Sequence, residues 1–121
     1  MINRKVFISL MGCLLTAPLV VHAGDADFLL VNRTGYAIRE IYVSPSKKKN
    51  WGQDRLGKAT LENGRQRQFK LGNFADCTQD IMVVFDDDGS EVIWENLDLC
   101  ELEKITLRYN RRTREVIADT E

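Results

Sequence analysis

Carboxylates and cysteines are the side chains with which this chain could do chemistry, because histidine occurs only once, at His22. The densest carboxylate run is Asp86-Asp87-Asp88-Gly89-Ser90-Glu91, which places acidic side chains at alternate positions before a glycine. Calcium loops often begin in this way, since Ca²⁺ is held by several oxygen ligands. Asp86 and Asp88 are therefore candidate calcium ligands, and calcium is the one cofactor that the sequence leaves open.

A hairpin turn is the competing interpretation of this acidic run. An EF-hand loop needs a glutamate at its twelfth position, and counting from Asp86 that position is Leu97. A calcium site completed by Asp98 or Glu101 from a neighbouring loop stays open. In a hairpin turn, aspartates cap the backbone and Gly89 supplies a positive φ angle without strain.

The cysteines must be interpreted together with the N-terminus, which has the features of a secretory signal peptide. Arg4 and Lys5 precede an apolar run from Val6 to Leu15, and Val21-His22-Ala23 has the form of a cleavage site before Gly24. A lipidated Cys13 and a retained membrane anchor are alternatives, although the apolar run is short for an anchor. We expect residues 1–23 to be removed and residues 24–121 to form one domain in the periplasm or outside the cell.

Cleavage leaves Cys77 and Cys100 in an oxidising compartment, which predicts a disulfide between them. It would close a loop of about 24 residues and stabilise the domain by roughly 3 kcal/mol on the chain-entropy model. Two free thiols or a redox-active pair are the alternatives, but no Cys-x-x-Cys motif is present.

A lysine-rich loop is the strongest candidate for contact with a partner. Three consecutive lysines, Lys47, Lys48 and Lys49, precede Trp51 and must project into water or toward an anionic partner. Trp51 could stack on a sugar or anchor a protein partner. Alternatively, the lysines are only solvated, and Trp51 covers the end of the fold while Asp54 accepts backbone N–H bonds within the loop.

Composition excludes several classes of function. The chain has 17 Lys plus Arg against 18 Asp plus Glu. Because Arg4 and Lys5 lie in the predicted leader, about 15 cationic residues and a net charge of about −3 remain after cleavage. This balance argues against nucleic-acid binding. Residues 24–121 lack histidine, a Gly-x-Ser-x-Gly elbow and a glycine-rich phosphate loop, so we expect no enzyme. A small glycan hydrolase with two facing carboxylates is the remaining catalytic alternative.

The elements that must position these residues are short strands. Seven segments separated by turn residues have the patterns of strands, and none has a helical stripe. Most of them alternate apolar and polar residues, while Ala26–Asn32 is a short apolar run. Ile81–Phe85 is apolar on both faces, as in a central strand, and Trp94 shares a face with Val92, as in a core. The pattern predicts a single all-β domain, an antiparallel β-sandwich of seven or eight strands without a transmembrane segment. The predicted segments are Ala26–Asn32, Ala37–Ser44, Gln66–Leu71, Ile81–Phe85, Glu91–Glu95, Lys104–Tyr109 and Arg114–Ala118.

Three motifs give the chain a resemblance to a family of small exported bacterial proteins. They are N-x-T-G-Y at Asn32–Tyr36, V-S-P-S at Val43–Ser46 and W-G-x-D-x-L-G at Trp51–Gly57; Cys77, the acidic turn and Asp98-Leu99-Cys100 also match. Some members carry an argininosuccinate lyase name, but this chain is too short to hold the helices and catalytic residues of such an enzyme. The resemblance implies an exported β-rich module without an established activity. We therefore expect a disulfide-linked module that binds a protein or an anionic envelope component, with a calcium-dependent module as the alternative.

Overall fold

The computed structural model describes residues 24–121, which form seven strands and one short 3-10 helix. The predicted leader, residues 1–23, lies outside the described residues. The strands are β1 (Phe28–Arg33), β2 (Ile38–Pro45), β3 (Gln66–Phe69), β4 (Thr78–Phe85), β5 (Glu91–Asp98), β6 (Lys104–Asn110) and β7 (Glu115–Thr120), and the 3-10 helix η2 covers Leu99–Glu101.

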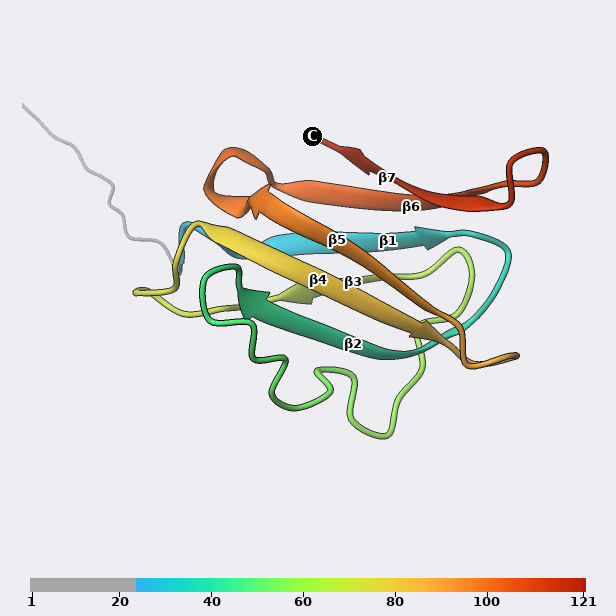
Figure 1. Cartoon of the computed structure of the whole chain (residues 1–121), viewed down its shortest axis with the longest axis horizontal. Coiled ribbons are helices and arrows are strands. Elements are labelled where there is room, and N and C mark those ends of the chain that lie inside the picture. Colours follow the sequence, from blue (N-terminus) through green and yellow to red (C-terminus); the bar gives the residue numbers. More distant parts are fainter. Residues whose placement is uncertain (1–23) are drawn as a thin grey trace, which may run out of the picture.

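The strands form two sheets that pack face to face, so the predicted β-sandwich is confirmed (Figure 1). One sheet has the order β3-β1-β6-β7 and the other has the order β2-β4-β5. The expected all-antiparallel pairing needs one correction, because β1 and β6 run parallel, with Leu29 opposite Lys104 and Arg33 opposite Arg108. This long-range pairing places the first strand and the penultimate strand side by side at the centre of one sheet.

The core lies between the sheets, and its central strand is β4. Every residue of β4 after Thr78 is buried, as the apolar run Ile81–Phe85 predicted. Alternation along the predicted segment Ala37–Ser44 predicts Ile38 on one face and Ile41 on the other, and this prediction is wrong. A register shift between Ile38 and Glu40 brings both isoleucines into the core, where each is fully buried.

The irregular segment 46–65 closes the side of the sandwich between the edge strands β2 and β3 (Figure 1). Leu56 and Leu61 of this segment are both 4% exposed and belong to the core. Leu61 exchanges backbone hydrogen bonds with Ile38 of β2, and the Asn32 N–H and carbonyl of β1 pair with Arg65 and Gly64. The segment therefore connects both sheets. Residues 24–121 contain no helix that is long and apolar enough to cross a membrane.

Candidate functional site

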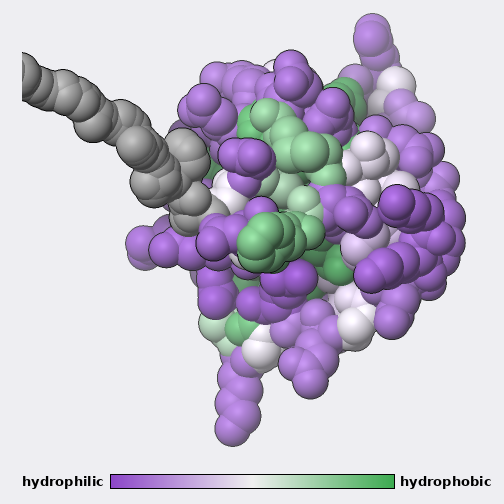
Figure 2. Space-filling view, turned by 90° about the vertical axis from the view of Figure 1, so that its left-hand side faces the viewer, coloured by the Kyte–Doolittle hydropathy of each residue, from purple (hydrophilic) through white to green (hydrophobic). Residues whose placement is uncertain are grey.

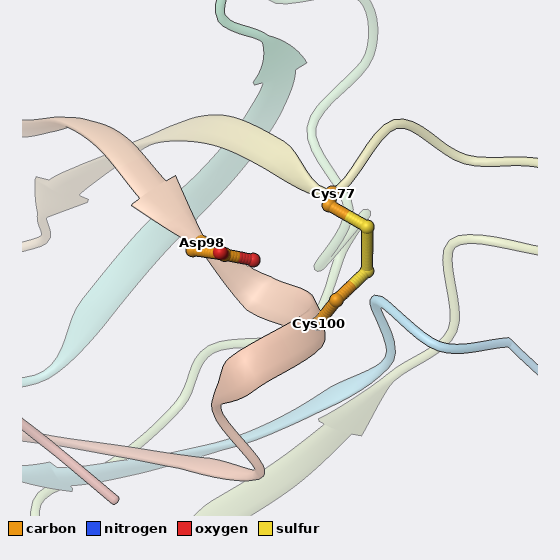
Figure 3. Close-up of side chains that lie close together, drawn as sticks. All are labelled: Cys77, Asp98 and Cys100. Atoms are coloured by element: carbon orange, nitrogen blue, oxygen red, sulfur yellow. A yellow bond between two sulfur atoms is a disulfide. The ribbon is translucent and has the colours of Figure 1, made fainter.

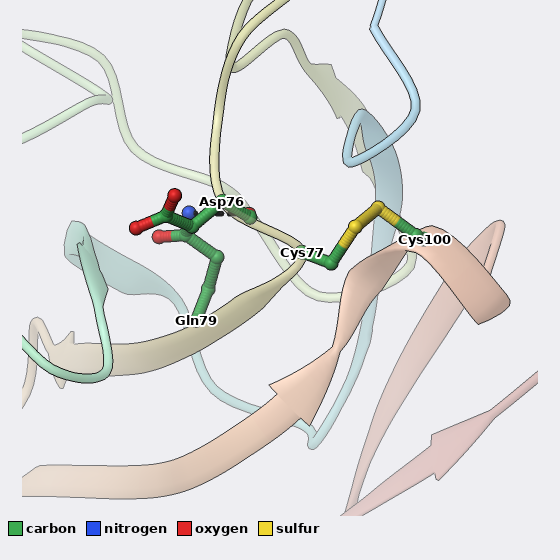
Figure 4. Close-up of a disulfide and its surroundings, with 4 residues drawn as sticks. All are labelled: Asp76, Cys77, Gln79 and Cys100. Carbon is green, nitrogen blue, oxygen red and sulfur yellow. Dashed lines mark hydrogen bonds between the residues drawn. A yellow bond between two sulfur atoms is a disulfide. The ribbon is translucent and has the colours of Figure 1, made fainter.

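The predicted disulfide is present: Cys77 and Cys100 are bonded, with their Cα atoms 5.1 Å apart. Cys77 precedes β4 and Cys100 lies in η2, directly after β5. The bond therefore closes the open end of the β4–β5 hairpin, opposite its turn (Figure 4). The backbone N–H of Leu99 also donates to the Cys77 carbonyl across 2.8 Å. Together these bonds hold the start of β4 against the end of β5.

A carboxylate lies beside this disulfide, but the group is not a metal centre. Asp98 and the two sulfur atoms lie within 4.8 Å of one another, and the Asp98 side chain extends toward the disulfide (Figure 3). Thiolate, not disulfide sulfur, is the form of cysteine that binds metals. With the sulfurs bonded to each other, Asp98 is the single carboxylate ligand that this group offers.

The lysine-rich turn that follows β2 is fastened to the sheet by Asp80, which is 1% exposed. The Asp80 carboxylate accepts hydrogen bonds from the Ser46 hydroxyl at 2.6 Å, the Asn96 backbone N–H at 2.9 Å and the Lys49 ammonium at 3.1 Å. Lys49 also pairs with Glu95 at 3.2 Å. Lys49 is exposed, as predicted for the three lysines, but its charge is used within the fold.

The electrostatics of Asp80 follow from these contacts. Burial raises its pKa, but the hydrogen bonds from Ser46, Asn96 and Lys49 outweigh burial and hold the pKa below its usual value of 3.8. The same hydrogen bond to Asp80, with that to Glu95, raises the pKa of Lys49. The buried carboxylate is therefore charged at neutral pH and organises the turn.

Lys47 and Lys48 differ from Lys49, because both are exposed and neither forms an ion pair within residues 24–121. Lys48 borders the same surface hollow as Phe74 of the loop that precedes Cys77. Phe74 is 99% exposed. We call Lys47, Lys48 and Phe74 the basic tip. Figure 2 looks onto this end of the sandwich and shows apolar side chains at its middle, ringed by hydrophilic ones.

The loop that carries Phe74 is anchored at both ends. The Asp27 carboxylate accepts a hydrogen bond from the Leu71 N–H at 2.7 Å, and the disulfide fixes Cys77. Near Cys77, the Gln79 side chain donates to the Asp76 carbonyl at 2.8 Å (Figure 4). Anchors on either side restrain a loop that presents an aromatic ring to solvent, although burial of that ring would be favourable.

Trp51 is half-buried and lies outside the basic tip. It lines a hollow with Val43 and Phe69, on the side of the sandwich that segment 46–65 closes. Asp54, in the same segment, accepts the N–H of Ile41 and the N–H of Leu56, both at 2.9 Å. The bond from Leu56 lies within the loop, as the structural interpretation of Asp54 predicted. The bond from Ile41, which was not predicted, fastens this segment to β2.

The acidic run forms the turn between β4 and β5. Gly89 has φ 71°, its N–H donates to the Phe85 carbonyl, and Asp88 accepts the Ser90 N–H at 2.9 Å. Asp98 follows at the far end of β5, seven residues from Glu91, and at about 3.3 Å per residue that separation is on the order of 20 Å. The hypothesis of a calcium site in which Asp86 and Asp88 share Asp98 or Glu101 is therefore wrong.

Sequence analysis missed a cleft between the edge strands β5 and β7. It has a volume of about 870 Å³. Its apolar lining comes from both sheets and includes Tyr36, Phe85, Val92, Trp94, Val116 and Ala118. Trp94 faces the core, as expected, but it is only half-buried because it forms a wall of this cleft.

The N-x-T-G-Y motif explains how Tyr36 reaches the cleft. Asn32 is fully buried and donates to the carbonyls of Tyr36 at 2.7 Å and Leu61 at 2.9 Å, while its own side-chain carbonyl accepts from Thr34. Gly35, between Thr34 and Tyr36, has a φ angle of 90°, a conformation that favours glycine. The turn holds Tyr36 edge-to-face against Phe85 and Tyr109 while leaving it 43% exposed. An Asn-x-Thr pair ahead of Gly-Tyr was the signal for this arrangement.

Comparisons with known proteins establish the fold and no activity. The sequence matches no protein-family model and none of the curated proteins with which it was compared. The fold is similar to that of a protein from Eubacterium rectale solved by NMR, with a TM-score of 0.57 and 14% sequence identity; the match covers 81% of this chain and 87% of that chain. What the two proteins share is the sandwich architecture.

Proposed function

We propose that this chain is an exported binding module without catalytic activity, which contacts an anionic component of the cell envelope through its basic tip. The observation that carries the proposal is the exposed Phe74 ring, which borders the same surface hollow as Lys48. Lys47, also exposed, is the neighbour of Lys48 in the chain. Lysine ammonium groups attract phosphate-rich surfaces, and an aromatic ring gains free energy when a partner removes it from water.

The division among the lysines refines the expected contact. Lys49 is held by Asp80 and Glu95, so its charge is partly neutralised within the molecule. Lys47 and Lys48 remain available to a partner. Trp51, half-buried near Val43, contributes to the wall of the fold and not to this contact.

The absence of catalysis is part of the proposal. A carboxylate glycosidase needs a general acid whose pKa is raised. The carboxyl groups with clearly shifted pKa values are Glu40, Asp80 and Asp88, and in each the pKa is lowered. For Asp88 the main cause is the hydrogen bond from the Ser90 backbone, a structural contact of the turn.

Export is proposed on two grounds. Cys77 and Cys100 form a disulfide, and such bonds persist in oxidising compartments such as the periplasm or the extracellular space. The first 23 residues also have the pattern of a signal peptide, and the sequence resembles small exported bacterial proteins.

A sedimentation assay tests the proposed contact. We expect the purified protein to sediment with vesicles of phosphatidylglycerol and phosphatidylcholine and not with vesicles of phosphatidylcholine alone. Replacing both Lys47 and Lys48 with Ala should weaken binding about tenfold or more, because each lysine contributes separately to attraction by an anionic surface. The matched control is Lys58→Ala, another exposed lysine that forms no ion pair in the described chain.

A second arm distinguishes the two sources of phosphate. Polyphosphate beads offer phosphate without acyl chains, so Phe74→Ser should weaken binding to the vesicles and leave binding to the beads unchanged if the partner is a lipid. If Phe74→Ser weakens binding to vesicles and beads equally, or weakens binding to neither, the result would favour a phosphate polymer as the partner. The proposal would be overturned if the protein binds neither the vesicles nor the beads. It would also be overturned if replacing Lys47 and Lys48 with Ala leaves binding undiminished.

A further inference from the structure

The sandwich has two open sides, one between the edge strands β2 and β3 and one between β5 and β7, and they differ in how they are covered. Between β2 and β3, segment 46–65 inserts Leu56 and Leu61 into the core and pairs with the backbone of both sheets. Between β5 and β7 a cleft takes the place of such a segment. Within residues 24–121, the second side therefore lacks a covering segment like the one on the first.

The side chains that face this cleft belong to the core but are incompletely covered. Val92 and Trp94 of β5, and Val116 and Ala118 of β7, pack against the buried cluster and are half-buried. Behind them Phe85 is 5% exposed. These residues offer an apolar floor whose burial would be favourable if another segment lay over it.

The walls of the cleft are the backbones of two edge strands. β5 pairs with β4 alone and β7 pairs with β6 alone within the described chain, so each has an outer edge that can accept another strand. On β5 the edge is interrupted at Asn96, which has φ 58° and lies where the register with β4 shifts. β7 keeps an unbroken register from Glu115 to Thr120. The regular edge of β7 is the better template.

One end of the cleft is acidic. The turn after β4 contributes Asp87 and Asp88, and the start of β7 contributes Glu115, against the single cation Arg114. A basic residue in the occupant would therefore be attracted to this end.

We propose that the cleft between β5 and β7 binds an extended polypeptide segment of a partner protein, which adds to the edge of β7 and carries alternating apolar residues with a basic residue at one end. Strand addition satisfies the backbone groups of the edge, while every second side chain covers Trp94 and Val116. An acyl chain would cover the same floor, but it has no groups to pair with the backbone. This site is separate from the basic tip.

A designed peptide serves as the probe. It alternates valine and threonine over eight residues and ends in lysine. A second peptide of the same length, also ending in lysine, has proline at two central positions to prevent strand pairing. In a Trp51→Phe background, Trp94 is the sole tryptophan and its fluorescence reports binding. We expect the first peptide to change this fluorescence and to protect from hydrogen exchange the β7 amides that do not already donate to β6. We expect the proline peptide to do neither.

Two variants test the location. Ala118→Phe fills the cleft and should weaken peptide binding at least tenfold, whereas Ala59→Phe, at an exposed alanine outside the cleft, should leave it unchanged. Replacing Asp87 and Asp88 with Asn should weaken binding of the peptide that ends in lysine. Binding of a peptide that ends in threonine should be unaffected.

The proposal is overturned if the alternating peptide produces no fluorescence change at millimolar concentration, if the proline peptide binds equally well, or if Ala118→Phe binds like Ala59→Phe. Protection of the β7 amides without peptide, rising with protein concentration together with dimer formation, would assign the cleft to a second copy of this chain and would also overturn it.

Discussion

The Asp80→Asn substitution tests the reasoning about the lysine-rich turn most directly. The asparagine side chain has nearly the same shape as the aspartate, so the change removes a charge without creating a cavity. In the wild type the carboxylate accepts three hydrogen bonds, from Ser46, Asn96 and Lys49. The variant has one carbonyl oxygen in place of two carboxylate oxygens. Its NH₂ group cannot accept a hydrogen bond, so at least one of the three donors loses its acceptor.

The expected cost follows from these contacts. A hydrogen bond to a charged group contributes roughly 1.5–3 kcal/mol, and a buried donor left without an acceptor costs roughly 1–3 kcal/mol. Since the asparagine still accepts some of the bonds, we expect a loss of about 2–3 kcal/mol in the free energy of unfolding at pH 7. For a domain of this size the melting temperature should fall by roughly 8–20 °C.

The effect of pH provides a second readout. The pKa of Asp80 is lower in the folded protein than its usual value of 3.8, so its charge stabilises the fold above that value. This stabilisation is lost as the pH falls through the folded-state pKa. Urea unfolding of the two proteins should therefore show a constant difference above about pH 5 and a shrinking one at more acidic pH.

The matched control is Asp86→Asn, an exposed aspartate in the turn between β4 and β5, for which we expect a change below about 0.5 kcal/mol. An Asp80→Asn variant as stable as this control at pH 7, or a stability difference that does not shrink in acid, would refute the assigned role of Asp80.

Two further predictions concern the disulfide and the N-x-T-G-Y turn. Replacing Cys77 and Cys100 with Ser should cost roughly 3 kcal/mol, given their sequence separation of 23; calorimetry with and without reductant measures this, and a reductant effect that persists in the variant would contradict it. Asn32→Ala removes both donors of a fully buried amide and should cost about 2–4 kcal/mol in urea unfolding. A change under about 0.5 kcal/mol would show that Asn32 does not hold the turn.

Much of the architecture could be predicted from local patterns. Alternation and short apolar runs between turn residues located all seven strands, and the continuous apolar run marked β4 as the central strand. The failures came from information that is not local. A register shift at Arg39 put Ile38 in the core, and the parallel pairing of β1 with β6 joins segments that are far apart along the chain.

The candidate sites were harder to predict for the same reason. In a run of three lysines nothing distinguishes Lys49, whose partner Asp80 lies 31 residues away. Phe74 reads as an ordinary loop residue until the structure shows it 99% exposed. The cleft combines side chains from two hairpins and from the turn at Tyr36, so no single stretch of sequence contains it.

Segment 46–65 has a practical consequence for anyone who modifies this protein. It lacks regular secondary structure, yet Leu56 and Leu61 are core residues and its backbone connects the two layers. Shortening it, or inserting an epitope tag there, would open the interior to solvent. The exposed turn 111–113 is where extra residues would be accommodated without such damage.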